Sequence, residues 1–175
     1  MKFELIESES IFKGRAFDIR RDHVRLPDGR TTKLDIVNHI GSVVIVPVDE
    51  QGSLYFVRQY RHAAGQDMLE LPAGTLEPGE DPFVCAQREV REETGMAADQ
   101  IRDIGGFYLA PGYSTEFMRV YLATDLRQDP LEADEDEFLS VEKLPVAEAI
   151  ALAESGGLPD AKSLAALLLA KPYLS

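Results

Sequence analysis

The stretch GTLEPGEDPFVCAQREVREETGM, residues 74–96, decides the fold and the chemistry of this chain. Its middle predicts a helix over residues 82–94. Asp81 stands at the N-cap position, and Pro82 suits the first helical position. Gly95 follows the last turn, where a helix commonly ends in a left-handed residue. We therefore expect a short, well-capped helix. Its expected core-facing side chains are Phe83, Ala86 and Val90.

Three glutamates of this helix, Glu89, Glu92 and Glu93, occur at spacings i, i+3 and i+4. At about 100° per residue they share one narrow stripe on adjacent turns. Like charges placed this way repel and cost a helix roughly a few tenths of a kcal/mol per pair. A divalent cation would remove that repulsion, because carboxylate oxygens are the ligands that Mg²⁺ and Mn²⁺ prefer. The alternative is a solvated acidic face.

The composition is that of an ordinary globular protein, with 45% apolar and 28% charged residues in 175 positions. This length predicts one main domain with a real core. The net charge of −13 argues against binding to nucleic acid or to an anionic membrane, because either would need a basic surface. A small polyanion stays compatible with this charge if metal ions and local arginines neutralise it.

The predicted location is the cytoplasm. The single cysteine, Cys85, excludes an intramolecular disulfide and fits a reducing compartment. No signal peptide is visible at the start, where glutamates interrupt the sequence. The longest apolar runs are too short to span a bilayer.

Residues 1–40 read as a small antiparallel β unit. Strands are expected over residues 2–11, 15–26 and 31–39, and Asp28-Gly29 is a strong hairpin turn signal between the last two. A unit of this size must pack on the main domain or on a second subunit.

Residues 41–175 read as the main domain, of mixed α/β composition and α+β class. The run SVVIVPV (residues 42–48) is typical of a strand buried on both faces. Further strands or extended pieces are expected over residues 53–60, 68–73, 104–110, 117–124 and 138–144. Two helices are expected at the end of the chain, from near Pro145 to Gly156 and from Asp160 to Ala170. The apolar stripe of the second is expected to be Leu164, Leu167 and Leu168.

The spacing within residues 74–96 resembles the Nudix box. Gly74 is followed by five residues, Glu80, seven residues and then REVREETGM, so every specified position of that motif is matched. The resemblance implies hydrolysis of a nucleoside diphosphate linked to another moiety, with divalent metals bound by a loop-helix-loop. It also implies an α/β/α sandwich around a mixed sheet. Backbone freedom is the expected reason for Gly74, Gly79 and Gly95.

Segments outside the box resemble the ADP-ribose pyrophosphatase branch of that family. These are QYR (residues 59–61), LELPAG (residues 69–74) and a proline loop that begins at Pro111. The proline loop is shared with enzymes that act on other nucleoside diphosphate sugars. The expected reaction is therefore cleavage of ADP-ribose to AMP and ribose 5-phosphate. The alternatives are another nucleotide sugar such as GDP-mannose, a non-catalytic sensing module and a triphosphatase.

The resemblance also assigns roles to residues. The expected cofactor is Mg²⁺, with Mn²⁺ as a substitute, and its ligands are Glu89, Glu93, the carbonyl of Ala73 and Glu92, directly or through water. Arg88 is similar to the family arginine that orients these acids by ion pairing. Glu80 is expected to hold the loop in shape.

Substrate contacts are expected from Arg61, Phe17, Glu70, Pro111 and Gly112. Arg61 suits the diphosphate, because a guanidinium pairs bidentately with phosphate. The alternative is a surface arginine at a strand end. Phe17 could stack on the base or simply belong to the core. Relatives often stack adenine on a tryptophan, which this chain lacks.

The general base is expected to be Glu135, Glu137 or Glu116. The first two lie in the acidic stretch 132–137, which is a poor packing element and matches a mobile catalytic loop of this branch. The alternative is a solubilising loop. Relatives of this branch exchange N-terminal strands across a two-fold axis, so a homodimer through residues 1–40 is also expected.

Overall fold

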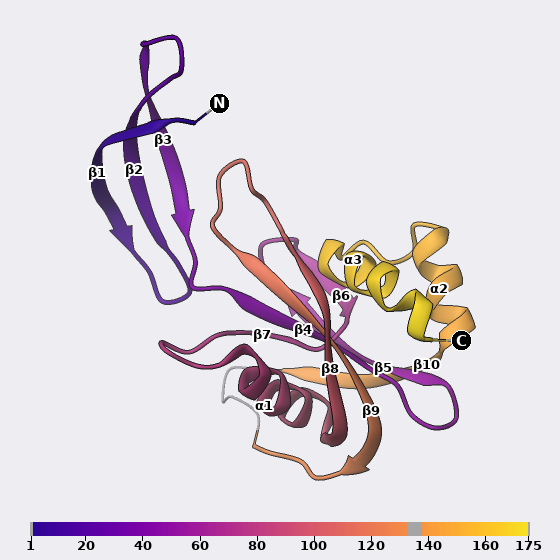
Figure 1. The fold of residues 1–175 in the computed structure, drawn as a ribbon. Helices are drawn as coiled ribbons and strands as arrows, with labels where there is room; N and C mark the ends of the chain where they lie inside the picture. Colours follow the sequence, from indigo (N-terminus) through magenta and orange to yellow (C-terminus); the bar gives the residue numbers. More distant parts are fainter. Residues whose placement is uncertain (1, 133–137, 175) are drawn as a thin grey trace. The chain divides into compact units, whose positions relative to one another are not determined.

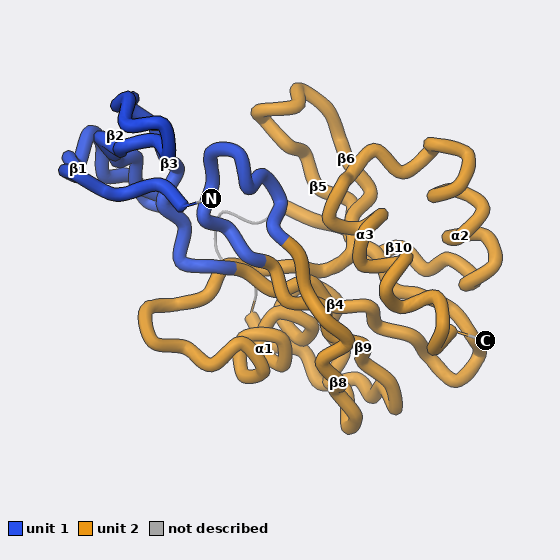
Figure 2. Tube along the Cα trace, turned by 45° about the horizontal axis from the view of Figure 1, so that its top comes forward, with its two compact units in different colours: residues 1–41, 108–117 blue, residues 42–107, 118–175 orange. Residues whose placement is uncertain are grey.

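The computed structural model describes residues 2–132 and 138–174. The chain divides into two compact units, which Figure 2 colours separately. The first unit holds residues 1–41 and 108–117, and the second holds residues 42–107 and 118–175. The segment 108–117 therefore belongs with the N-terminal strands, although it connects two strands of the second unit along the chain.

The first unit is built on a three-stranded antiparallel sheet in the order β1-β2-β3. Its strands are β1 (Glu4–Lys13), β2 (Asp18–Arg25) and β3 (Thr31–Asn38). The turn at Asp28-Gly29 joins β2 to β3, and Gly29 adopts the positive φ of 89° that the turn requires. A bridge between Val37 and Ser114 attaches the segment 108–117 to β3.

Strand β1 lies at an edge of this sheet and is solvent-exposed along its whole length. Large apolar side chains on or beside it are about half exposed, namely Phe3, Leu5, Ile6, Ile11 and Phe12. An edge strand that presents backbone groups and apolar side chains to solvent is a template for pairing with another chain.

The second unit contains two sheets. The four-stranded sheet has the order β7-β4-β9-β8 and is mixed, because β4 runs parallel to β9 and antiparallel to β7. The three-stranded antiparallel sheet has the order β10-β5-β6. The strands are β4 (Ser42–Pro47), β5 (Ser53–Arg61), β6 (Gln66–Glu70), β7 (Ala73–Thr75), β8 (Met96–Tyr108), β9 (Phe117–Gln128) and β10 (Leu139–Pro145).

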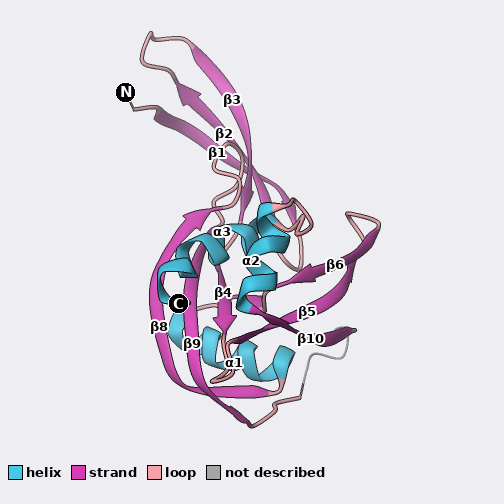
Figure 3. Cartoon of the chain, turned by 90° about the vertical axis from the view of Figure 1, so that its right-hand side faces the viewer, coloured by secondary structure: helices cyan, strands magenta, loops and turns pink. Residues whose placement is uncertain are grey.

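Helices cover both sides of these strands (Figures 1 and 3). The helices are α1 (Pro82–Thr94), α2 (Val146–Glu154), α3 (Ala161–Ala170) and a short 3₁₀ turn, Lys171–Tyr173. Helix α1 contacts β4 and β7 on one side, and α3 contacts β4 on the other. The predicted α/β/α sandwich of α+β class is confirmed. None of the helices in the described part of the chain has the length and hydropathy to cross a bilayer.

Strand β4 lies at the centre of the core, and all six of its residues are buried. Side chains alternate between the faces of a strand, and on one face Val43 and Ile45 join a cluster with Ala86 and Val90 of α1. The continuous apolar run in the sequence thus corresponds to a strand that is covered on both faces, as expected.

The caps predicted for α1 are confirmed. The Asp81 carboxylate accepts a hydrogen bond from the backbone N–H of Phe83 at 2.8 Å, and Gly95 has a φ of 73°. The predicted burial of two side chains is wrong, because Phe83 is 41% exposed and Leu168 is 72% exposed. Strand β8 begins at Met96, well before the predicted residue 104. It lies at a sheet edge, where solvated polar side chains conceal the strand pattern.

Candidate active site

Arg88 gathers three carboxylates around one guanidinium. Nη1 donates to Oε1 of Glu89 at 2.7 Å and to Oε2 of Glu92 at 2.8 Å. Nε donates to Oε1 of Glu80 at 3.1 Å. The hydrogen bond with Glu80 raises the pKa of Arg88 and holds the pKa of Glu80 below its ordinary value. A cation on the same helix therefore offsets the repulsion along the acidic stripe.

Glu93 is held by the backbone that precedes the helix. The N–H of Ala73, the first residue of β7, donates to Oε2 of Glu93 at 2.9 Å. Glu93 is 4% exposed, and Glu89 is 6% exposed one turn earlier. Burial of a carboxylate is costly without partners, so the fold holds these two acids at fixed positions rather than leaving them on a solvated face.

Gly74 lies directly against Glu89. A Cβ atom at position 74 would lie 1.7 Å from Oε1 and 2.6 Å from Cγ of Glu89, distances that real atoms do not adopt. Gly74 is not among the glycines with positive φ. The reason for glycine here is therefore the close approach of a carboxylate, rather than the backbone freedom that the sequence suggested.

Arg61 and Glu70 form a bidentate ion pair across neighbouring strands β5 and β6. Nε donates to Oε1 at 2.8 Å and Nη2 donates to Oε2 at 2.6 Å. Glu70 is 2% exposed, whereas the side chain of Arg61 is 42% exposed. Burial by itself would raise the pKa of Glu70, but hydrogen bonds from Arg61 and Lys162 hold that pKa below its ordinary value.

Four other predicted site residues belong to the first unit. Phe17 precedes β2 and is 43% exposed. Pro111 and Gly112 lie in an exposed turn, and Glu116 directly precedes β9. The substrate and base roles of these residues stay predictions. Glu135 and Glu137 lie outside the described residues.

Comparison with known proteins shows which family this chain belongs to. The family model described as NUDIX domain matches residues 38–167, and the model described as nucleoside diphosphate sugar hydrolase N-terminal domain matches residues 3–33. The chain belongs to the Nudix family. Like other Nudix hydrolases it is an enzyme that uses a divalent metal.

Two curated relatives and one solved structure illustrate the similarity. An ADP-ribose pyrophosphatase of Bacillus subtilis is 38% identical over 93% of this chain and 89% of its own length. An ADP-ribose pyrophosphatase of Mycobacterium tuberculosis is 40% identical over 95% of this chain and 82% of its own length. The crystal structure of an ADP compounds hydrolase superposes with a TM-score of 0.89, at 26% identity, over 99% of this chain and 95% of that one.

The residues of the Nudix box fit a divalent metal by their chemistry. Glu89 and Glu92 share one nitrogen of Arg88 as a partner, so their carboxylates lie close together, and Glu93 follows Glu89 one turn later. Oxygen donors of this kind are those that hard divalent cations take. Within the described residues, no group of three His, Cys, Asp or Glu side chains is close enough in this arrangement to hold an ion. Arg88 engages Glu89 and Glu92 instead.

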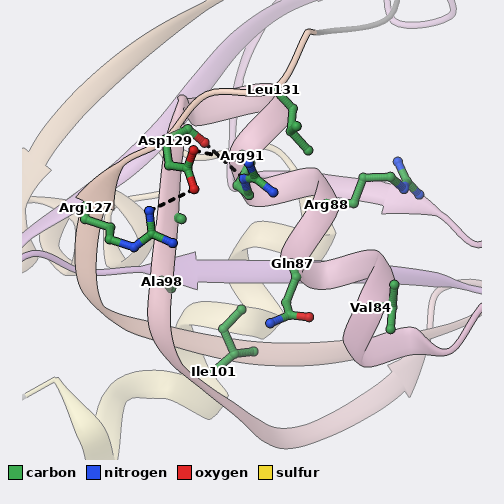
Figure 4. Close-up of a pocket in the computed structure, with 10 residues that line it drawn as sticks. Val84, Gln87, Arg88, Arg91, Ala98, Ile101, Arg127, Asp129 and Leu131 are labelled. Atoms are coloured by element: carbon green, nitrogen blue, oxygen red, sulfur yellow. Dashed lines mark hydrogen bonds and ion pairs between the residues drawn. The ribbon is translucent and has the colours of Figure 1, made fainter.

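A groove of about 290 Å³ lies beside α1 (Figure 4). Val84, Gln87, Arg88 and Arg91 line it from the helix at spacings of three and four residues. Figure 4 shows Arg91 and Arg127 both directed at Asp129, to which they are ion-paired. Glu89, Glu92 and Glu93 are not among the residues that line this groove.

Sequence reasoning missed the first turn of α3. Lys162 contacts Glu70, and the Ser163 hydroxyl accepts a hydrogen bond from the backbone N–H of Leu71, whereas the sequence indicated only an apolar stripe for this helix. A signal was present. Ser163 stands four positions before Leu167 of the expected apolar stripe, which places it toward the core-facing side of the helix.

Proposed function

We propose that this Nudix enzyme hydrolyses the diphosphate bond of ADP-ribose to AMP and ribose 5-phosphate with Mg²⁺. The observation that carries the proposal is the ordered acidic stripe of α1. Its glutamates are positioned by Arg88 and by the N–H of Ala73, as a catalytic site requires and a solvated face does not. The two ADP-ribose pyrophosphatases at 38% and 40% identity supply the substrate class.

The residues that would hold the metal are Glu89, Glu92, Glu93 and the carbonyl of Ala73. A divalent ion bound there supplies charge neutralisation for the diphosphate and a lowered pKa for a bound water. Arg88 keeps two of the acids together before substrate arrives, and Ala73 fixes the third. Mn²⁺ has the same preference for oxygen ligands and is the expected substitute.

Arg61 is the proposed contact for the diphosphate. A guanidinium carries five N–H donors in a planar fork, and Glu70 engages the side formed by Nε and Nη2. The end of the fork stays available to a second anion, which matches the partial exposure of Arg61. Glu70 would then act through Arg61, by fixing the plane of its guanidinium.

The proposed general base is one of Glu116, Glu135 and Glu137. Replacing each in turn by glutamine separates them, because loss of the base lowers kcat and removes its ionisation from the pH–rate profile. Two of the three replacements should leave that profile in place.

The proposed assembly is a homodimer through the N-terminal strands, and the proposed compartment is the cytoplasm. The exposed apolar side chains of edge strand β1 support the first, because a second copy would cover them. The free, buried thiol of Cys85 is compatible with the reducing cytoplasm.

A panel of nucleotide sugars tests the substrate. We expect the largest kcat/KM for ADP-ribose, with AMP and ribose 5-phosphate as products. GDP-mannose cleaved more efficiently than ADP-ribose would replace the proposed substrate. Binding of ADP-ribose without turnover of any member of the panel would indicate a sensing module.

A further inference from the structure

We propose that Lys162, in the first turn of α3, is a positioning residue that holds Glu70 in place and thereby orients Arg61 toward the diphosphate. This inference rests on the proposed function for its substrate. It adds a residue from the C-terminal helix, distant in sequence from the Nudix box, to the machinery that prepares the site.

Two charged side chains, Lys162 and Glu70, connect α3 to Arg61. Nζ of Lys162 donates to Oε2 of Glu70, and that same oxygen accepts from Nη2 of Arg61. Nζ also donates to Oδ2 of Asp160, the N-cap of α3, at 2.8 Å. Glu70 therefore lies between two cations, and neither Glu70 nor Lys162 is open to solvent. Lys162 therefore holds the Glu70 carboxylate in the one orientation in which it binds Arg61.

The backbone beside Glu70 is anchored by the same helical turn. Oγ of Ser163 accepts from the N–H of Leu71 at 2.7 Å and donates to Oδ2 of Asp160 at 2.5 Å. Leu71 is two residues before Ala73, whose N–H holds Glu93. The first turn of α3 thus fixes both the side chain of Glu70 and the chain that leads into the box.

Stability alone is a poor reason for a buried lysine at this place. Apolar side chains of similar volume often replace a buried ion pair without loss of stability, and sometimes with a gain. What apolar side chains cannot do is set the direction of a carboxylate. Each buried polar side-chain atom in the described residues has a hydrogen-bond partner, so the cluster is complete, as a positioning role requires.

Arg61, a member of this cluster, also interacts electrostatically with Glu93 of the acidic stripe. The hydrogen bond with Glu70 is the main cause that raises the pKa of Arg61, and the charges of Glu93 and Asp160 raise it further. Arg61 therefore stays cationic, and it is near enough to Glu93 to feel its charge. A change in its orientation would alter the diphosphate contact beside the metal-binding acids.

Replacement of Lys162 by methionine tests the proposal. Lys162→Met keeps the length of the side chain and removes its charge, and Lys162→Arg restores the charge. Lys171→Met is the matched control, because Lys171 lies in the turn after α3, is exposed and pairs with Glu154. We expect Lys162→Met to lower kcat/KM for ADP-ribose by about 10- to 100-fold, mainly through KM. Lys162→Arg should recover most of the loss, and Lys171→Met should match the parent enzyme.

A double-mutant cycle with Arg61→Ala separates positioning from general support of the fold. If Lys162 acts through Arg61, Lys162→Met should cause no further loss of kcat/KM in the Arg61→Ala background. Additive losses would overturn the proposal, as would an unchanged kcat/KM in Lys162→Met. Should Lys162→Met fail to fold, Lys162→Gln replaces it in the same cycle, with the same pattern expected.

The NMR signal of the Arg61 Nε–H gives a readout that needs no substrate. It is assigned by its absence in Arg61→Ala. In the parent enzyme this proton should exchange slowly with water, because it is bonded to buried Glu70. We expect fast exchange in Lys162→Met and slow exchange in Lys171→Met. Slow exchange in both would overturn the positioning role, whereas failure of the parent enzyme to cleave any nucleotide sugar would overturn the proposed function instead.

Discussion

Gly74 and Glu89 are so close that a methyl group on Gly74 would lie 1.7 Å from Oε1 of Glu89. The contact joins β7 to the acidic stripe of α1. We predict that Gly74→Ala forces the Glu89 side chain away from Arg88 and lowers kcat at least about tenfold. Because the displaced atoms belong to one side chain and not to the backbone, the free energy of unfolding should fall by no more than about 1–3 kcal/mol.

A double-mutant cycle in urea checks the cause. In a Glu89→Ala background the space beside position 74 is free, so Gly74→Ala should cost measurably less stability there than in the parent enzyme. Equal costs in the two backgrounds would show that Glu89 is not the obstacle.

Removal of divalent metal should abolish turnover and lower stability. The three glutamates of α1 repel one another, and a bound cation offsets that repulsion. We predict that chelation stops ADP-ribose cleavage and that Mg²⁺ restores it. At about 100 times its dissociation constant, the ion should raise the free energy of unfolding by about 2.7 kcal/mol. Turnover that persists in excess chelator would contradict the metal site.

Glu70 should contribute a pH-dependent stability. Its pKa is lowered from the ordinary value of 4.5 in the folded chain, so its contribution is fully present above that value and is lost as the pH falls through the lowered pKa. We predict that Glu70→Gln, which leaves two cations without their shared anion, costs roughly 3 kcal/mol near neutral pH.

Urea denaturation of both proteins across the acid range measures this difference. The gap between the parent enzyme and Glu70→Gln should narrow steadily once the pH is below the ordinary pKa. A gap of constant size down to strongly acidic pH would show that the ionisation of Glu70 does not stabilise the fold.

The exposed apolar face of β1 should be a dimer contact. We predict that light scattering of the parent enzyme gives the mass of a dimer and that Leu5→Ser with Phe12→Ser shifts it to a monomer. Phe83→Ser is the control, because Phe83 is a comparably exposed phenylalanine on the second unit. A monomeric parent enzyme would refute the proposed assembly.

The sequence predicted those features that depend on local chemistry. Asp81 and Gly95 mark the ends of α1 because a cap is formed within one turn of the chain. Arg88 and the three glutamates of α1 are likewise close together in the sequence, so the sequence also indicated that all four belong to one helix. Burial was harder to predict, as Phe83 and Leu168 show, because it depends on which neighbours the fold brings to a helix.

Contacts between distant segments could not be predicted. Glu70 and Lys162 are separated by more than 90 positions, and nothing in either segment by itself names the other. The role of Gly74 was likewise invisible, because it depends on the side chain of Glu89 rather than on the glycine's own backbone angles. The sequence indicated only that polar residues at core-facing positions of a helix need a buried partner, and not which residue that partner is.

The most direct test of the catalytic stripe is the rate of ADP-ribose hydrolysis by Glu93→Gln with saturating Mg²⁺. Glutamine keeps the size of the side chain and an oxygen that can accept from the N–H of Ala73, and it loses the negative charge. We predict a kcat at least about 100-fold below that of the parent enzyme, with a thermal unfolding midpoint that, measured without metal, is no lower than that of the parent enzyme. A kcat equal to that of the parent enzyme would contradict the assignment of α1 as the metal-binding catalytic element.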